Sequence, residues 1–185
     1  MMRRILAGGL MSALVLTLSL ASYGDDKTGD GKPIAKSAAT NANFEKLKKI
    51  VGTWVQVDKD GKTTDQVVSI VKLTAGGSAI HETLFPGQPM EMVSVYTVDG
   101  ADLVMTHYCV LGNQPRMKAD PKSPTDQIVF RFAGGSNLDV SKDKHMHEAI
   151  LTLVTDDRIE VNGSGWENGA PVKEMCCGLK LARKK

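Results

Sequence analysis

Alternating apolar and polar residues dominate the chain from residue 53 to its end. Short runs rich in Val, Ile, Thr, Phe and Tyr are separated, about every ten residues, by clusters of Gly, Asn, Asp and Pro. Such runs are typical of antiparallel strands joined by short turns. We predict ten strands, near residues 53–58, 63–73, 78–85, 90–98, 103–110, 114–118, 127–133, 145–154, 158–166 and 171–182.

One stretch before these strands has helical periodicity. Its apolar stripe consists of Phe44, Leu47, Ile50 and Val51, and Gly52 stands where helices commonly stop. Ten sequential strands leave two sheet edges, and an up-and-down barrel removes both edges with short connections. The predicted fold is therefore all-β: an up-and-down antiparallel β-barrel of about ten strands with a short N-terminal helix. A two-sheet sandwich, with crossovers through residues 111–126 and 134–144, is the alternative.

The N-terminus has the pattern of an export signal. Two arginines precede an apolar run over residues 5–20, and small residues occupy the cleavage-defining positions Ser19 and Ala21. No later run is long and apolar enough to cross a bilayer. We predict a signal peptide over residues 1–21 and an exported protein, periplasmic or extracellular, with no stable membrane insertion after processing. An uncleaved anchor is the alternative.

Composition then divides the rest of the chain. Residues 22–42 contain almost no large apolar side chain, which predicts a flexible linker, and residues 43–185 form the predicted barrel domain. The signal contains two of the 23 basic residues and none of the 21 acidic ones, so the mature part is balanced in charge. This balance argues against nucleic acid or an anionic membrane surface as a partner.

Three cysteines are an odd count for an exported chain. Cys109, Cys176 and Cys177 can form at most one disulfide within a monomer. We predict that all three are small, buried or half-buried side chains. A disulfide between Cys109 and Cys177 is the alternative.

The tripeptide Gly52-Thr53-Trp54 stands directly after the predicted helix, at the start of the first strand. It resembles the Gly-x-Trp signature of the lipocalin-like (calycin) barrels. A later stretch, Met105-Thr-His-Tyr-Cys followed by Gly112-Asn-Gln-Pro-Arg-Met117, is similar to secreted bacterial barrels of unassigned function. The resemblance implies that Trp54 packs at the closed end of the barrel against a basic side chain of the last strand, either Arg183 or Lys180. It implies no activity.

Turn lengths predict which side chains share a face, because direction alternates along a strand. Passing through the turns at 156–157 and 168–169, the predicted interior collects His145, His147, Ala149, Leu151, Leu153, Glu160, Asn162, Ser164, Trp166, Met175, Cys177, Leu179, Leu181 and Arg183. Polar groups among apolar ones are what a ligand-holding interior needs and a solid core avoids.

The strands that flank the Asp99-Gly100 hairpin turn leave one choice open. One face gathers His81, Ser94, Tyr96, Met105, His107 and Cys109, and the other gathers Glu82 and Tyr108. The soft side chains favour the His107 face as the interior. Following the faces from an inward Trp54 favours Tyr108 instead, and one bulge at Gly76-Gly77 would reverse that result. Both His107 and Tyr108 stay candidates, with His107 preferred.

We predict that the interior holds a small, apolar or amphipathic molecule. The predicted ligand contacts are Tyr96, Met105, His107, Tyr108, Arg116, Asn162 and Trp166. Methionines give an adaptable lining, and Arg116 offers a cation at the rim for a carboxylate or phosphate group.

Two other function classes stay open. His107, Cys109, His145 and His147 are candidate metal ligands, and His107 with Cys109 is a candidate pair for a barrel enzyme or a haem site. No Cys-x-x-Cys or His-Glu-x-x-His motif accompanies them, and the residues after Trp54 depart from the glycine-rich pattern of haem-binding barrels. The other class is a barrel with a filled core that binds a protein. We predict no cofactor and assign no catalytic residue.

Overall fold

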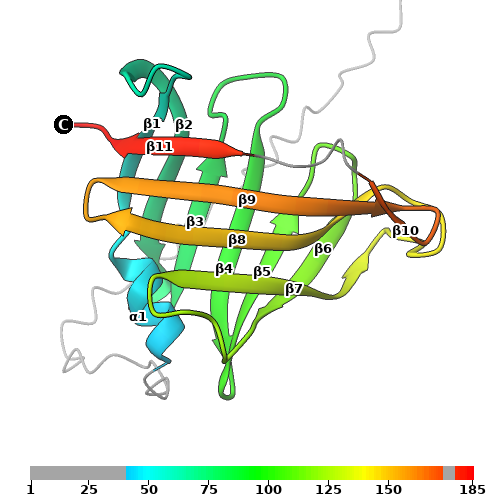
Figure 1. Ribbon diagram of the computed structural model, residues 1–185. Coiled ribbons are helices and arrows are strands. Elements are labelled where there is room, and N and C mark those ends of the chain that lie inside the picture. The colour runs from blue at the N-terminus through cyan, green and yellow to red at the C-terminus, as the bar shows by residue number, and fades with distance from the viewer. Residues whose placement is uncertain (1–40, 173–177) are drawn as a thin grey trace, which may run out of the picture. The chain divides into compact units, whose positions relative to one another are not determined.

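The computed structural model describes residues 41–172 and 178–185, which form a short helix and a β-barrel (Figure 1). In chain order the elements are α1 (Ala42–Lys48), β1 (Gly52–Val57), β2 (Thr63–Thr74), the short 3-10 turn η1 (Ala75–Gly77), β3 (Ala79–Leu84), β4 (Met92–Asp99), β5 (Asp102–Tyr108), β6 (Gln114–Ala119), β7 (Gln127–Ser136), β8 (His145–Thr155), β9 (Arg158–Glu167), β10 (Ala170–Val172) and β11 (Leu179–Arg183). The predicted signal peptide and nearly all of the predicted linker lie outside the described residues. So do the predicted inward residues Met175 and Cys177, and with them the Cys109–Cys177 pairing.

Antiparallel pairing closes the strands into a ring. Each strand from β1 to β9 pairs with the next, β9 pairs with β11, and β11 pairs with β1. The first and last strands meet where Trp54 lies opposite Arg183 and Gln56 lies opposite Leu181. The predicted ten-strand up-and-down barrel is therefore confirmed, and the sandwich alternative is wrong. In Figure 1, β7, β8 and β9 cross in front of the strands β1 to β6.

The predicted last strand, 171–182, corresponds to two described strands on one edge of β9. β10 pairs with the end of β9, around Trp166, and β11 pairs with its beginning, around Ile159. β8 occupies the opposite edge of β9. β9 therefore pairs with three strands, and β10 is an addition to the ring rather than part of it.

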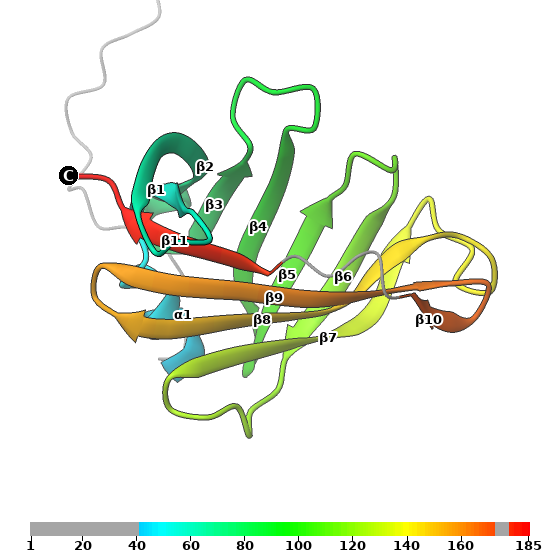
Figure 2. The same ribbon diagram turned by 45° about the horizontal axis from the view of Figure 1, so that its top comes forward.

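Helix α1 begins where the sequence supplies a cap. The Asn41 side chain accepts a hydrogen bond from the Phe44 amide at 3.0 Å, which satisfies one of the free amides of the first turn. Phe44, Leu47 and Ile50 are buried in the barrel core, whereas Val51 is exposed. α1 thus covers one end of the barrel (Figure 2). Across the two described ranges, no helix has the length and apolar character needed to span a bilayer.

Rows of paired residues carry the core across the strands. One row joins Ile80, Tyr96, Met105, Met117 and Phe132 on β3 to β7. Its first four members are almost fully buried. Directly paired residues lie on the same face of a sheet, so this row identifies the interior.

The predicted inner face is correct on β11 and over the middle of β8, but wrong on β9. Ile159 and Val161 pack against the core, opposite Leu153 and Leu151. Glu160, Asn162 and Ser164 therefore point outward. The cause is a register shift between Leu153 and Thr155, because an extra residue in one strand moves its partner's side chains to the other face.

Candidate functional site

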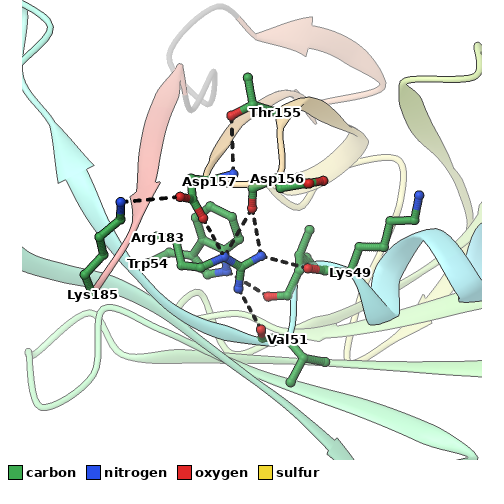
Figure 3. Close-up of polar contacts among 9 residues, drawn as sticks. Lys49, Val51, Trp54, Thr155, Asp156, Asp157, Arg183 and Lys185 are labelled. Carbon is green, nitrogen blue, oxygen red and sulfur yellow. Dashed lines mark hydrogen bonds and ion pairs between the residues drawn. The ribbon is translucent and has the colours of Figure 1, made fainter.

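The closed end of the barrel is built around Trp54 and Arg183. The Arg183 guanidinium carbon lies 4.5 Å from the centre of the Trp54 ring, which is fully buried. The guanidinium donates hydrogen bonds to the carbonyl oxygens of Lys49, Val51 and Asp156, at 2.8 to 3.1 Å (Figure 3). One side chain of the last strand thereby ties the C-terminal end of α1 to the β8–β9 turn.

The glycine of the Gly-x-Trp tripeptide has a steric reason. A Cβ atom on Gly52 would lie 2.7 Å from Nη1 of Arg183, and the backbone there has a φ of +143°, which side-chain-bearing residues rarely adopt. Lys180, the alternative partner of Trp54, is exposed, and its Nζ lies 3.8 Å from Oε1 of Glu160 instead. The packing implied by the resemblance is therefore present, with Arg183 as the basic residue.

Two adjacent cavities lie inside the barrel. The helix-side cavity, next to Ile50 of the closed end, has a volume of about 70 Å³, and the distal cavity, farther from α1, has a volume of about 130 Å³. Leu84, Met146, Ala149 and Val161 contribute to the walls of both. Because these walls come from β3 on one side and from β8 and β9 on the other, the cavities lie in the lumen.

The distal cavity is mostly apolar. Its lining includes Leu84, Phe85, Met92, Met146 and Leu179, together with His107 and Cys109. The interior space is smaller than the few hundred cubic ångströms usual for ligand pockets. A larger hollow, about 430 Å³, lies on the outer surface beside Asp65, Arg158 and Lys185. That hollow is charged and open, so it lacks the apolar enclosure of a small-molecule site.

A buried polar row crosses the barrel wall beside the cavities. Glu82 of β3 lies opposite Ser94 of β4, and Ser94 lies opposite His107 of β5. Two hydroxyls donate to the Glu82 carboxylate at 2.6 Å, Ser69 to Oε1 and Tyr96 to Oε2. All five side chains are at most 9% exposed. Burying a carboxylate costs desolvation free energy unless its oxygens are hydrogen-bonded. The hydroxyls of Ser69 and Tyr96 provide one hydrogen bond to each oxygen.

Burial changes the protonation of this row. It lowers the pKa of His107 to about 4, so the ring is neutral at pH 7. Burial also raises the pKa of Tyr96, and the nearby Glu82 raises it further by its charge and by its hydrogen bond. The Tyr96 hydroxyl therefore keeps its proton, and that proton is directed at Glu82.

The predicted ligand residues fall into two groups. Tyr96, Met105 and His107 are buried and face the interior, and Met105 and Tyr96 line the helix-side cavity. Tyr108 is 50% exposed, and Arg116 points outward to an ion pair with Asp99 at 3.0 Å. The preference for His107 over Tyr108 as the inward residue is confirmed.

Asn162 and Trp166 lie apart from the buried polar row. Asn162 is exposed, although it lies at the edge of the distal cavity. Trp166 is half-buried and stacks on His147 with ring centres 4.2 Å apart. Neither residue is hydrogen-bonded to Glu82, Ser94 or His107 in the part of the chain that the structure describes.

The remaining metal candidates meet in an aromatic cluster. His147 stacks between Phe132 and Trp166, and its Nδ1 lies 3.2 Å from Nε2 of His145. His145 Nδ1 donates to the carbonyl oxygen of Asp143 at 2.8 Å. Burial and the neighbouring His145 lower the pKa of His147. Over residues 41–172 and 178–185, no three His, Cys, Asp or Glu side chains converge as metal ligands would.

Sequence reasoning missed Glu82, Ser69 and the role of Ser94. Turn counting put Glu82 on the face opposite Ser94, but the two are directly paired, so that prediction is wrong. The pairing of Leu84 with Met92 leaves seven residues in the loop Phe85–Glu91. Because this number is odd, even-numbered residues of β3 lie on the same face as even-numbered residues of β4. The signal available in the sequence was a lone acidic residue between Ile80 and Leu84, in an otherwise apolar alternation.

Comparisons with known proteins gave no match to a family model and no match to a curated protein.

Proposed function

We propose that this protein is an exported, lipocalin-like barrel that binds a small, largely apolar molecule in its distal cavity. The observation that carries the proposal is the apolar cavity of about 130 Å³ between opposite walls of the barrel. The packing of Arg183 on Trp54 behind Gly52 supports the lipocalin-like assignment. The signal-like N-terminus supports export.

The volume sets the size of the ligand. An apolar cavity of about 150 Å³ holds a benzene-sized molecule in another protein, so the distal cavity suits a ligand of similar size. Met92 and Met146 are flexible thioethers in its wall and allow modest enlargement towards the helix-side cavity. Haem is several times larger than this space, which favours a small ligand over haem.

Filling the cavity tests the proposal. Ala149 lines both cavities, so Ala149→Leu places additional carbon atoms where the ligand would lie. Ala133 of β7 is exposed, and Ala133→Leu makes the same change of side chain outside the barrel. We expect calorimetric titration with toluene to give saturable binding to the wild type and to Ala133→Leu, and at least tenfold weaker binding to Ala149→Leu. Equal binding by all three proteins, or no binding by the wild type, would contradict the proposal.

A further inference from the structure

Glu82 is the one buried carboxylate among the described residues. It is 9% exposed and contributes to the wall of the helix-side cavity, together with Ser94, Tyr96 and Met105. The other buried polar side chains are serines, histidines and an asparagine, and no Lys or Arg of the described ranges is buried. The barrel interior therefore holds an acidic group without a buried Lys or Arg to balance it.

The Glu82 carboxylate also lacks an ion pair. In the described part of the chain no Lys, Arg or His side chain forms one with it, whereas Glu148 on the outer face pairs with Arg131 at 2.7 Å. His107, two strands away, is neutral at pH 7 because burial lowers its pKa to about 4. A buried charge is costly unless an opposite charge compensates it. The position beside Glu82 is therefore favourable for a cation.

The Glu82 oxygens keep free hydrogen-bonding capacity. Ser69 donates to Oε1 and Tyr96 donates to Oε2, each at 2.6 Å. A carboxylate has about four acceptor positions, so these hydroxyls occupy about half of them. The two donors come from β2 and β4, on either side of β3, and hold the carboxylate from both sides. Glu82 is thereby a fixed acceptor for a further, positively charged donor.

The two cavities together suit a ligand with one apolar part and one charged part. They share the walls Leu84, Met146, Ala149 and Val161, so they lie side by side, and a molecule that displaces the flexible Met146 side chain reaches both. The distal cavity of about 130 Å³ suits an aromatic ring. The helix-side cavity of about 70 Å³ has room for a small polar group.

We propose that the ligand is a small amine, with its apolar body in the distal cavity and its ammonium group against the Glu82 carboxylate in the helix-side cavity. This inference rests on the proposed function, because it names the chemical class of the molecule that the barrel binds. An ammonium group brings a positive charge and three donors to a site that offers a negative charge and free acceptor positions. Neutral molecules of the same shape bind more weakly.

Benzylamine and benzyl alcohol test the inference, because they have the same shape and only the amine is charged at pH 7. We expect calorimetric titration of the wild type to show at least tenfold tighter binding of benzylamine, which corresponds to about 1.4 kcal/mol. Glu82→Gln keeps the shape of the side chain and removes its charge. It should weaken benzylamine binding about tenfold and change toluene binding less than about twofold.

Glu160→Gln is the matched control, because it removes a carboxylate from the outer face of β9. It should leave benzylamine binding unchanged. Retained toluene binding by Glu82→Gln shows that the fold and the distal cavity are intact.

The outcomes separate the two claims. If toluene binds the wild type but benzylamine binds no better than benzyl alcohol, the amine proposal is overturned while the proposed function stands. A preference for benzylamine that persists in Glu82→Gln also overturns it. If the wild type binds none of the three molecules, both claims fail.

Methionine methyl NMR of the wild type gives a second test that needs no variant. Met92 lines only the distal cavity and Met105 only the helix-side cavity. Toluene should shift the Met92 signal and leave Met105 nearly unchanged, whereas benzylamine should shift both. A benzylamine titration that shifts Met92 alone, or neither signal, would overturn the proposal.

Discussion

Among single residues, the most unusual feature of the barrel interior is that polar side chains are buried in it. Burying apolar side chains at these positions would cost less free energy. Glu82, Ser94 and His107 form a row whose members bond to one another or to Ser69 and Tyr96. Each buried polar group needs a partner, and the carboxylate of Glu82 and the hydroxyl of Ser94 find theirs within this row and its two neighbours.

The lowered pKa of His107 predicts a pH dependence of folding. The folded-state pKa is about 4 and the ordinary value is 6.5, so the unfolded chain binds the proton more tightly. The stability that His107 contributes to the unfolding free energy is therefore fully present above about pH 6.5. It is lost as the pH falls towards 4. Between pH 7 and pH 4.5 we expect the wild type to lose about 2 kcal/mol of unfolding free energy from this residue.

Urea unfolding of the wild type and of His107→Leu at the two pH values measures this loss. The variant should lose less stability than the wild type by about that amount. His147, whose pKa is also lowered, is present in both proteins, so its effect cancels in the comparison. An equal loss in both proteins would show that His107 is not buried as a neutral ring.

At the scale of elements, the strands could be read from the sequence because turn residues mark their ends. Asp99-Gly100 and the other turn clusters mark the strand positions, and the amphipathic stretch before Gly52 marks α1. The face of the sheet on which each side chain lies was harder to predict from the sequence. The register shift between Leu153 and Thr155 and the odd loop Phe85–Glu91 each reverse a face, and both are set by how strands pair in three dimensions.

The candidate site was predictable only in part for the same reason. His107, Tyr96 and Met105 were found because they lie on one face of a hairpin whose register follows from its tight turn. Glu82 was missed because its face depends on the β3–β4 loop, where Phe85 adopts a φ of +52° that is unusual for its residue type. Arg116 was selected for its charge and lies on the outer face.

The last strand offers a test at this scale. Arg183→Met should lower the unfolding free energy by about 2 to 4 kcal/mol, because it leaves the carbonyls of Lys49, Val51 and Asp156 without their shared donor. Lys180→Met on the same strand removes an exposed charge and should change stability by about 0.5 kcal/mol or less. Chemical denaturation of both variants makes the comparison. Similar losses would mean that Arg183 does not hold the closed end together.

At the scale of the whole barrel, closure by β11 between β1 and β9 removes the sheet edges of the ring and encloses a lumen that side chains only partly fill. α1 and the Trp54–Arg183 pair cover one end, and the free volume lies beyond Ile50. A ring of ten strands is wide enough to hold a small ligand, as closed barrels of similar size do. Ligand binding therefore requires that a molecule from solution can enter this hollow.

Methionine methyl NMR during titration with toluene tests that dependence most directly. Met92 and Met146 line the distal cavity, whereas Met90 is 46% exposed in the loop before β4. We predict saturable shifts of the Met92 and Met146 methyl signals, with the Met90 signal nearly unchanged. Shifts that grow without saturation, or that are as large at Met90 as at the two cavity residues, would contradict a ligand-binding lumen.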